Sequence, residues 1–269
     1  PWASSLYMVQ KADGSWRPCG NYRRLNLVTK PDQYPPPHIE DLTAQLAGKS
    51  FFTKLDLKKG YYQIPVAEKD VLKTAVITPF GLFVFRRMPF GLRNAGQSFQ
   101  RFMDRVLAGV PHVFVYLDDL LVASSSKEEH EKDVKAVLDR LKKHGLVINH
   151  EKCVFAAREV EYLGHLVTEA GLRPLPARVE AIADFPPPTT RAELQGFLGM
   201  VNFYRRFIRG AASILRPLTD ATRGPGGRNT PVDMTPQMSA AFRAAKDALA
   251  AAAMLAHPRE RAELSLAVD

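Results

Sequence analysis

The chain has 269 residues, which is enough for one core divided into subdomains or for two small domains. Hydrophobic residues make up 46% of the sequence, the content of a globular protein. The net charge of +9 and a pI near 9.6 favour an anionic partner, with nucleic acid first among the candidates and simple solubility as the alternative explanation.

Membrane-spanning and disulfide-stabilised classes are not indicated. There is no signal peptide, and the longest apolar stretch, residues 249–256, is too short and too rich in alanine to span a bilayer. We therefore expect a soluble chain with no membrane partner. Cys19 and Cys153 lie far apart and outside any Cys-x-x-Cys pattern, so neither a disulfide framework nor a zinc site is implied, and a reducing compartment is expected.

The N-terminal segments are predicted to be mostly extended. Residues 6–9 and 16–22 are typical of two strands around the turn-rich, basic tip Lys11-Ala12-Asp13-Gly14-Ser15. A helix is expected over residues 39–46, with Gly48 as its stop. Residues 51–57 then indicate a strand that ends in the lone carboxylate of Asp56.

Two amphipathic helices follow. The first is predicted at Asn94, since Gln97 stands three residues later as in a capping box, and it ends near Gly109. The second begins at Ser126, with Glu129 at the same spacing, and ends at His144-Gly145. Their apolar faces consist of Phe99, Phe102, Met103 and Val106 in the first, and Val134, Val137, Leu138 and Leu141 in the second.

Between these helices, Tyr116-Leu117-Asp118-Asp119 separates the apolar runs 113–115 and 120–122. β-branched and aromatic residues favour strands whereas Asp-Asp favours a turn, so the segment predicts a hairpin with two carboxylates at its tip. Adjacent buried carboxylates repel each other and are stabilised by shared divalent cations. If the strand ending in Asp56 lies alongside, the carboxylates form a site for two Mg²⁺, as in phosphoryl transfer. A solvated Asp-Asp turn is the alternative.

The C-terminal part is predicted to be mainly helical. After the prolines at 186–188, Thr190 and Glu193 indicate a capping box. The core stripe of this helix is expected to be Leu194, Leu198, Val201 and Ile208, and a neighbouring stripe is Gln195, Gly199 and Phe203. Residues 224–227 are expected to form a flexible break, residues 240–256 an alanine-rich helix, and residues 264–268 a strand.

Four motifs occur in order along the chain: Leu55-Asp56-Leu57 with Gly60-Tyr61, Met88-Pro89-Phe90-Gly91-Leu92 with Phe99-Gln100, Tyr116-Leu117-Asp118-Asp119, and Tyr162-Leu163-Gly164-His165. Together they resemble a reverse transcriptase of the gypsy class of long-terminal-repeat retrotransposons, related to the retroviral enzymes. The resemblance runs from Pro1 to Asp269. It implies an α+β right-hand polymerase fold with fingers, a palm built on an antiparallel sheet, a helical thumb and the start of a connection.

The resemblance also implies domain boundaries. We expect fingers at 1–30 and 63–94, palm at 31–62 and 95–169 with the primer grip, thumb at 170–228, and a connection at 229–269 that includes the first strand of a truncated ribonuclease H domain. The chain begins without Met and ends on Asp269 within a strand-like run, so we expect a fragment of a longer polyprotein. Asp269 resembles the first metal-binding carboxylate of that ribonuclease H domain.

The catalytic carboxylates implied by the resemblance are Asp56, Asp118 and Asp119. Asp56 and Asp118 are expected to bind two Mg²⁺ ions directly, with the Leu57 carbonyl as a backbone ligand and Mn²⁺ as a substitute metal. The residues implied to bind the incoming deoxynucleoside triphosphate are Lys11, Arg17, Lys59, Gly60, Tyr61, Phe90, Gly91 and Lys152.

Four of these residues are basic, and three of the four are expected to act on phosphate groups. Lys11 and Arg17 correspond to the pair that grips the triphosphate, and Arg binds phosphate through two hydrogen bonds whereas Lys supplies a mobile charge. A solvated surface hairpin would also carry them. Lys152 is expected near the pyrophosphate leaving group.

The other positions concern the sugar. The Tyr61 ring is expected to collide with a 2′-hydroxyl and so to select deoxynucleotides, while Phe90 stacks against the sugar. The alternative for Tyr61 is a core aromatic, a role for which Tyr62 is the better candidate. Gly91 is expected to let the backbone approach the nucleotide or template closely.

Two further groups are expected to hold the nucleic acid. Leu163, Gly164 and His165 resemble the primer grip. Gln195, Gly199 and Phe203 match the residues of a thumb helix that follows the minor groove of the template-primer, although close helix packing would equally explain a mid-helix glycine that costs about 1 kcal/mol. Further phosphate contacts are expected from Arg205, Arg206 and Arg209.

The implied function is RNA-directed DNA synthesis on an RNA or DNA template with a primer. A catalytically silent nucleic-acid-binding module captured from a retroelement is one rival, and a two-metal nuclease is another. The three aspartates together with Tyr61 argue against the binding module, because binding alone needs none of them. Tyr61 and the stripe on the thumb helix argue against the nuclease, because a nuclease needs no sugar check. The expected location is the cytoplasm, in virus-like particles if the element is intact, and the sequence leaves open monomer or dimer.

Overall fold

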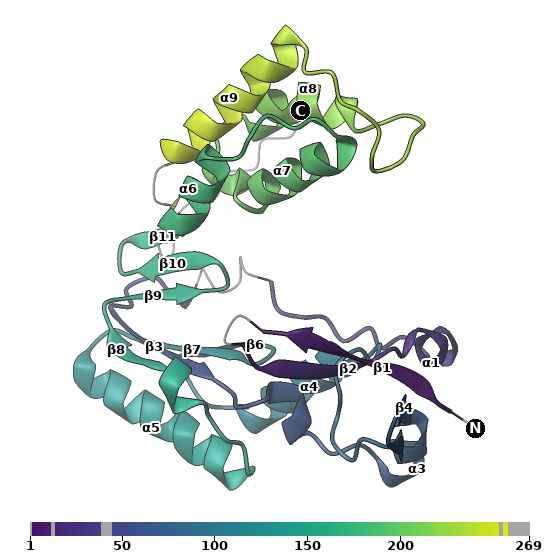
Figure 1. The fold of residues 1–269 in the computed structure, drawn as a ribbon. Helices are drawn as coiled ribbons and strands as arrows, with labels where there is room; N and C mark the ends of the chain where they lie inside the picture. Colours follow the sequence, from purple (N-terminus) through teal and green to yellow (C-terminus); the bar gives the residue numbers. More distant parts are fainter. Residues whose placement is uncertain (1, 12–13, 39–44, 253–254, 258–269) are drawn as a thin grey trace. The chain divides into compact units, whose positions relative to one another are not determined.

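The computed structural model describes residues 2–11, 14–38, 45–252 and 255–257. They divide into two compact units, Pro1–Arg158 and Glu159–Asp269, and Figure 1 shows strands and helices in each. Most of the helix expected over 39–46, the strand expected over 264–268 and Asp269 lie outside the described residues.

The first unit contains two four-stranded sheets. One sheet has the order β2-β1-β4-β5 and consists of β1 (Ser4–Gln10), β2 (Trp16–Gly20), β4 (Val76–Thr78) and β5 (Gly81–Phe83). The predicted hairpin is confirmed, since Gln10 pairs with Trp16 across the turn. The helical segments around this sheet are α1 (Arg23–Val28), η1 (Gly60–Gln63), α3 (Glu68–Val71) and η2 (Leu72–Thr74).

The second sheet has the order β6-β7-β3-β8 and consists of β6 (Val113–Tyr116), β7 (Asp119–Ser124), β3 (Phe51–Asp56) and β8 (Val154–Ala157). Helices α4 (Ala95–Val106) and α5 (Lys127–Lys143) bury their apolar faces against it, and η3 (His150–Lys152) precedes β8. Alternate residues of β3 and β7 point into this core, among them Leu55, Leu120 and Val122. The intervening residues therefore face away from the helices.

The predicted start of α5 is confirmed, whereas the capping box of α4 is wrong. Ser126 accepts a hydrogen bond from the Glu129 amide at the start of α5. Asn94 occupies the N-cap position of α4 but makes no side-chain cap. The side-chain nitrogen of Asn94 instead donates to the Lys30 carbonyl, and its side-chain oxygen accepts from the Asp32 backbone amide. These partners are 62 to 64 residues away in the sequence, so tertiary contacts occupy the side chain.

The second unit joins a small sheet to a group of helices. Its sheet has the order β12-β11-β10-β9, formed by β9 (Glu159–Tyr162), β10 (His165–Thr168), β11 (Gly171–Pro174) and β12 (Leu255–Ala256). The helices are α6 (Pro176–Ala183), α7 (Arg191–Phe203), η4 (Arg205–Phe207), α8 (Ala211–Ala221) and α9 (Pro236–Ala250). The capping box of Thr190 and Glu193 at the start of α7 is confirmed.

Two expectations for this unit are wrong. Ile208 is buried, but it lies beyond α7 and η4 and so is not part of the α7 stripe. The alanine-rich helix is α9, which begins at Pro236 and ends at Ala250, and residues 255 and 256 form strand β12. The rings of Phe197 and Phe242 lie 4.4 Å apart, so α9 packs within this unit.

The division of the structure falls between Arg158 and Glu159, whereas the expected end of the palm is residue 169. Strands β9 and β10 therefore belong to the same compact unit as α7 and α9. Among the helices that the structure describes, none is long and apolar enough to cross a membrane.

Candidate active site

The three predicted carboxylates converge at one end of the second sheet. β3 and β7 are antiparallel neighbours, and their register places Asp56 directly opposite Asp119. Tyr116 pairs with Asp119 across the β6–β7 hairpin, so Asp118 lies in the two-residue turn between these strands. Asp118 is exposed, and the other two aspartates are half-buried.

These carboxylates perturb one another. Burial raises the pKa of Asp56, and the Asp118 charge adds to the rise, while the Lys152 and Lys54 charges oppose it. Burial likewise raises the pKa of Asp119, with contributions from Asp118 and Asp56, although Lys54 lies only 3.7 Å from its Oδ1. One lysine does not offset the burial and repulsion of the set.

The donor set fits hard divalent cations. Carboxylate and carbonyl oxygens are the ligands that Mg²⁺ prefers, and a dication would relieve the repulsion that raises the two pKa values. The Leu57 carbonyl already accepts a hydrogen bond from the Gly60 amide at 3.2 Å, which leaves one of its two lone pairs. The arrangement suits the expected Mg²⁺ site.

Four neighbouring residues connect Asp118 to the N-terminal sheet through successive contacts. Gly60 lies tightly against Asp118, because a Cβ there would stand only 3.0 Å from the Asp118 side chain and would require it to shift. The Asp118 charge and burial raise the pKa of Tyr61, whose ring packs 5.2 Å from that of Phe90. The guanidinium carbon of Arg17 lies 4.5 Å above the centre of the Phe90 ring. Four predicted nucleotide-binding residues are thus joined to the carboxylates.

The side chain of Tyr62 points in a different direction from that of Tyr61. Its hydroxyl donates to the Pro18 carbonyl and its ring packs against Phe85 and Phe90. The ring of Tyr61 instead packs against Phe90 and Phe99, close to Asp118.

The other predicted nucleotide-binding residues occupy varied positions. Lys11 is exposed at the end of β1, and Lys59 is exposed in the turn before η1. Lys152 is exposed, and its charge acts on Asp56. Gly91 has φ of 93°, and a Cβ there would lie 3.0 Å from the Gly20 carbonyl oxygen, so the fold itself favours glycine at this position.

Gln100 belongs to one of the four sequence motifs, but the sequence alone assigned it no role at the site. It is 2% exposed, accepts a hydrogen bond from the Leu117 amide and donates to the Val115 carbonyl. Leu117 has φ of 55°, a left-handed conformation that costs a non-glycine residue about 1 kcal/mol or more. Gln100 thus holds the strained turn that presents Asp118. The sequence signal for this role is a glutamine that lies on the otherwise apolar face of α4.

Asn149 supports the other strand. The backbone amide of Asn149 donates to the Asp56 carbonyl at 2.8 Å, and its side chain forms a hydrogen bond with the Asp56 carboxylate. Gln63 binds the Lys58 carbonyl and both backbone groups of Val147, which fixes the loop that follows β3. The loop that carries Gly60 and Tyr61 is therefore held at both ends.

The predicted primer grip and minor-groove residues meet within the second unit. Leu163 and Gly164 form the turn of the β9–β10 hairpin, and the Tyr204 hydroxyl donates to the Gly164 carbonyl at 2.7 Å. The ring of His165 stacks 5.2 Å from that of Phe203. The hairpin is therefore anchored to the C-terminal end of α7.

The stripe of Gln195, Gly199 and Phe203 lies on the exposed face of α7. Among the residues that the structure describes, a Cβ on Gly199 would meet no atom within 4 Å outside its own stretch of helix, so close packing between these residues does not explain this glycine. Phe203 is 52% exposed, so much of its ring is accessible on this face of the helix.

Residues 9–167 match the family described as reverse transcriptase (RNA-dependent DNA polymerase). The chain belongs to the reverse transcriptase family. The matched residues include the three carboxylates and the hairpin turn at Leu163 and Gly164.

Curated relatives of this reverse transcriptase chain are transposon polyproteins. It is 41% identical over 233 residues to the retrovirus-related Pol polyprotein from transposon opus of Drosophila melanogaster, covering 83% of this chain and 23% of that protein. It is 36% identical over 257 residues to the transposon Tf2-3 polyprotein of Schizosaccharomyces pombe, covering 95% and 19%. These relatives confirm the resemblance to a gypsy-class Pol polyprotein, of which the chain spans about a fifth.

Solved structures agree on the fold. The chain superposes on a foamy viral protease–reverse transcriptase in complex with double-stranded DNA with a TM-score of 0.89 and 25% identity, covering 96% of this chain and 45% of that one. A foamy viral protease–reverse transcriptase in complex with an RNA/DNA hybrid gives a TM-score of 0.85 at 25% identity, covering 95% and 34%. The right-hand polymerase fold is confirmed.

Replacing Gln100 should loosen the turn that carries Asp118. We expect Gln100→Leu to lower the free energy of unfolding by about 1–3 kcal/mol, because the Leu117 amide and Val115 carbonyl lose their buried partner. Chemical denaturation measures the change. Gln97→Leu, on the same helix but half-exposed, is the matched control; an equal loss in both variants would contradict the role of Gln100.

His165 should make stability depend on pH. The residue is 3% exposed, and burial, aided by the Arg206 charge, lowers its pKa from 6.5 to about 4. The unfolded chain therefore binds this proton more readily, so the contribution is complete above pH 6.5 and is lost as the pH falls towards 4.

The measurement is denaturation of wild type and of His165→Phe, which cannot titrate. The wild type should lose more unfolding free energy between pH 6.5 and pH 4, by up to about 1.4 kcal/mol per pKa unit. A constant difference between the two proteins across this range would show that His165 is not buried in its neutral form.

Proposed function

We propose that this chain is the polymerase portion of an RNA-directed DNA polymerase, which adds deoxynucleotides to the 3′ end of a primer. The observation that carries the proposal is the placement of Asp56 opposite Asp119, with Asp118 in the adjoining turn, in a member of the reverse transcriptase family. The partners would be an RNA or DNA template with its primer and deoxynucleoside triphosphates. The nucleic acids bound to the foamy viral proteins support the first of these.

Two Mg²⁺ ions, when bound, would activate the primer 3′-hydroxyl and neutralise the leaving pyrophosphate. Asp56 and Asp118 would hold both ions, Asp119 would complete the negative set, and Mn²⁺ would substitute. Arg17, supported by the Phe90 ring, would bind the triphosphate, since a guanidinium contacts phosphate oxygens in pairs. Lys152, whose charge reaches Asp56, would stabilise the leaving group.

The residues beside the carboxylates would position the nucleotide. The Tyr61 ring, held between Phe90 and Phe99, would lie against the sugar and exclude a 2′-hydroxyl. The β9–β10 hairpin would hold the primer end, and the exposed stripe on α7 would follow the minor groove. Gly199, which has open space beside it, would allow that close approach.

The deciding experiment is extension of an oligo(dT) primer on poly(rA) with Mg²⁺ and dTTP. Incorporation supports the polymerase. Tight template-primer binding without incorporation would support the captured binding module, and cleavage of the template without incorporation would support a nuclease.

Removing either metal-binding carboxylate should abolish synthesis. We expect Asp56→Asn and Asp118→Asn each to reduce the rate by roughly a thousandfold or more, since metal ligation supplies several kcal/mol in the transition state. Template-primer binding should stay near the wild-type level. Primer extension and a binding titration measure the two effects.

Asp139→Asn is the charge-matched control, because Asp139 lies on the exposed face of α5 in an ion pair with Lys135. This variant should extend the primer normally. A near-normal rate in Asp56→Asn or Asp118→Asn would contradict the two-metal assignment.

Tyr61 should select the sugar through its bulk. Tyr61→Phe should keep the preference for dCTP over CTP, whereas Tyr61→Val should admit CTP, with about tenfold loss of selectivity for each ~1.4 kcal/mol of clash relieved. The measurement is kcat/KM for both nucleotides. Tyr62→Val is the control, because that ring packs towards Phe85. A shift in the control alone would identify the wrong tyrosine.

Filling the space beside Gly199 should reduce processivity. Gly199→Val should shorten the products of a single binding event more than it slows addition of one nucleotide, because the side chain would push the minor groove away. Gly196→Val is the matched control: this glycine is also exposed on α7 with open space beside it, but it lies off the stripe. Equal product lengths in the two variants would contradict the assignment.

A further inference from the structure

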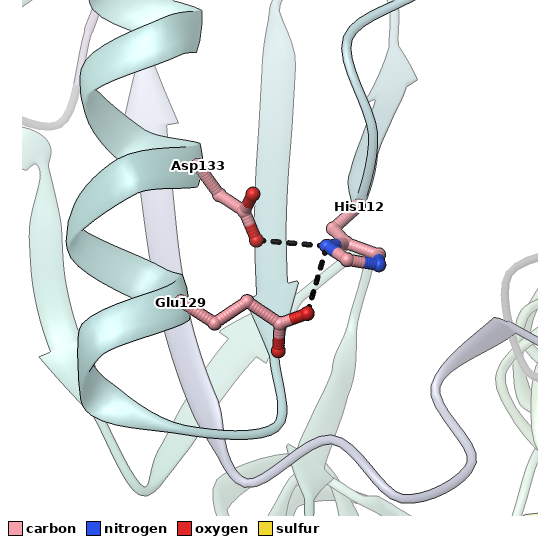
Figure 2. A group of neighbouring side chains, drawn as sticks. All are labelled: His112, Glu129 and Asp133. Carbon is pink, nitrogen blue, oxygen red and sulfur yellow. Dashed lines mark hydrogen bonds and ion pairs between the residues drawn. The ribbon is translucent and has the colours of Figure 1, made fainter.

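Three metal-ligating side chains converge on the helix-covered side of the second sheet, apart from the three catalytic aspartates. His112 directly precedes β6, and Glu129 and Asp133 stand one turn apart on the same face of α5. Figure 2 shows the two carboxylates pointing at the same ring nitrogen of His112. That Nδ1 lies 2.8 Å from Asp133 Oδ2 and 3.6 Å from Glu129 Oε1.

We propose that His112, Glu129 and Asp133 form a binding site for a first-row divalent transition-metal ion, with Zn²⁺ as the preferred occupant. Two ligand atoms bound to a tetrahedral Zn²⁺ at about 2.1 Å stand roughly 3.4 Å apart. The two distances from Nδ1 lie on either side of this value, and all three ligand atoms lie within 4.8 Å of one another. Small side-chain movements would complete three ligands and leave a fourth position to water.

The chemistry of the ligands separates this site from the Mg²⁺ site. An imidazole nitrogen with two carboxylates suits Zn²⁺, Co²⁺ or Ni²⁺, whereas Mg²⁺ prefers oxygen ligands and water. Cysteine spacing could not have indicated the site, because none of its ligands is a thiolate. The competing arrangement is an ion pair between protonated His112 and the carboxylates, with Lys49 as a further charge acting on Glu129.

Both carboxylates are oriented by groups outside the cluster. The Ser125 amide donates to Glu129 Oε2, which leaves Oε1 directed at His112. The Ser124 hydroxyl donates to Asp133 Oδ2 at 2.7 Å. The Asp133 side chain is 9% exposed, and this contact fixes the orientation of its carboxylate.

A buried hydrogen-bond chain sets the direction of that contact. Because Ser124 gives its single proton to Asp133, the His130 Nδ1–H must be the donor to Ser124 Oγ, 3.0 Å away. His130 Nε2 then accepts from the Thr53 hydroxyl at 2.6 Å, while Thr53 accepts from the Ala156 amide.

The ion would tie α5 to the start of the β6–β7 hairpin. The His112 carbonyl accepts from the Ala123 amide of β7, so its backbone already belongs to the base of the hairpin. Asp118 lies at the tip of the same hairpin. Metal binding would therefore stabilise the sheet that carries the catalytic carboxylates, without touching them.

The test is calorimetric titration of the folded chain with ZnCl₂ in excess Mg²⁺, in an Asp56→Asn background that weakens Zn²⁺ binding at the catalytic carboxylates. We expect one Zn²⁺ per chain in this background, little or no binding after His112→Asn or Glu129→Gln, and about 10–100-fold weaker binding after Ser124→Ala. Co²⁺ should give the absorption bands of a tetrahedral site. His144→Asn, an exposed histidine just beyond the end of α5, is the matched control and should bind normally.

Thermal unfolding supplies an independent readout. Zn²⁺ should raise the Tm of the background protein and of the His144 control, but not of Glu129→Gln, whose half-buried side chain can still accept the Ser125 hydrogen bond. No Zn²⁺ binding in the background protein would leave only the ion pair and overturn the proposal. Undiminished binding and Tm shift in Glu129→Gln and His112→Asn would overturn it as well.

Discussion

Two like charges placed opposite each other govern this structure. Antiparallel pairing of β3 and β7 puts Asp56 across from Asp119, an arrangement that destabilises a sheet unless a cation offsets it. Lys54, two residues before Asp56 on the same face, supplies part of that charge to Asp119, yet the pKa values of both aspartates remain raised. The apolar contacts of Leu55 and Leu120 beneath the pair therefore hold together a site that electrostatics alone would push apart. Such stored repulsion favours binding of dications, which is the chemistry expected of the family.

The sequence predicted the elements whose signals are local. The hairpin with Asp118, the start of α5 at Ser126 and the capping box at Thr190 depend on residues within a few positions of one another, and the structure contains all three. The strand expected over residues 51–57 is likewise present as β3, which ends at Asp56. Resemblance to a family supplied what local pattern could not, namely that these separate segments converge on one site.

The failures have a common physical cause, which is competition from distant partners. The side-chain amide of Asn94 forms hydrogen bonds with Lys30 and Asp32 and does not cap α4. Residues 255 and 256 pair with β11, so the alanine-rich helix stops earlier than its propensity would allow. The role of Gln100 could not be predicted from the sequence, because a glutamine on a helix is ordinarily a surface residue and only the fold brings the Leu117 amide to it. The His112 cluster is invisible for the same reason, since its members converge only through the packing of α5 on the sheet.

The register of β3 determines which residues lie on each face of the second sheet. Thr53, Leu55 and Leu57 face the helices, and the residues between them face the opposite side, so a slip of one position in β3 would bury Asp56 and expose the core. Buried polar atoms add to this constraint, because each of them needs a particular partner. The hydrogen-bond chain from Thr53 through His130 and Ser124 to Asp133 joins β3, α5 and β7 in one alignment. It therefore fixes the pairing that brings Asp56 opposite Asp119, from the face of the sheet that the catalytic carboxylates do not occupy.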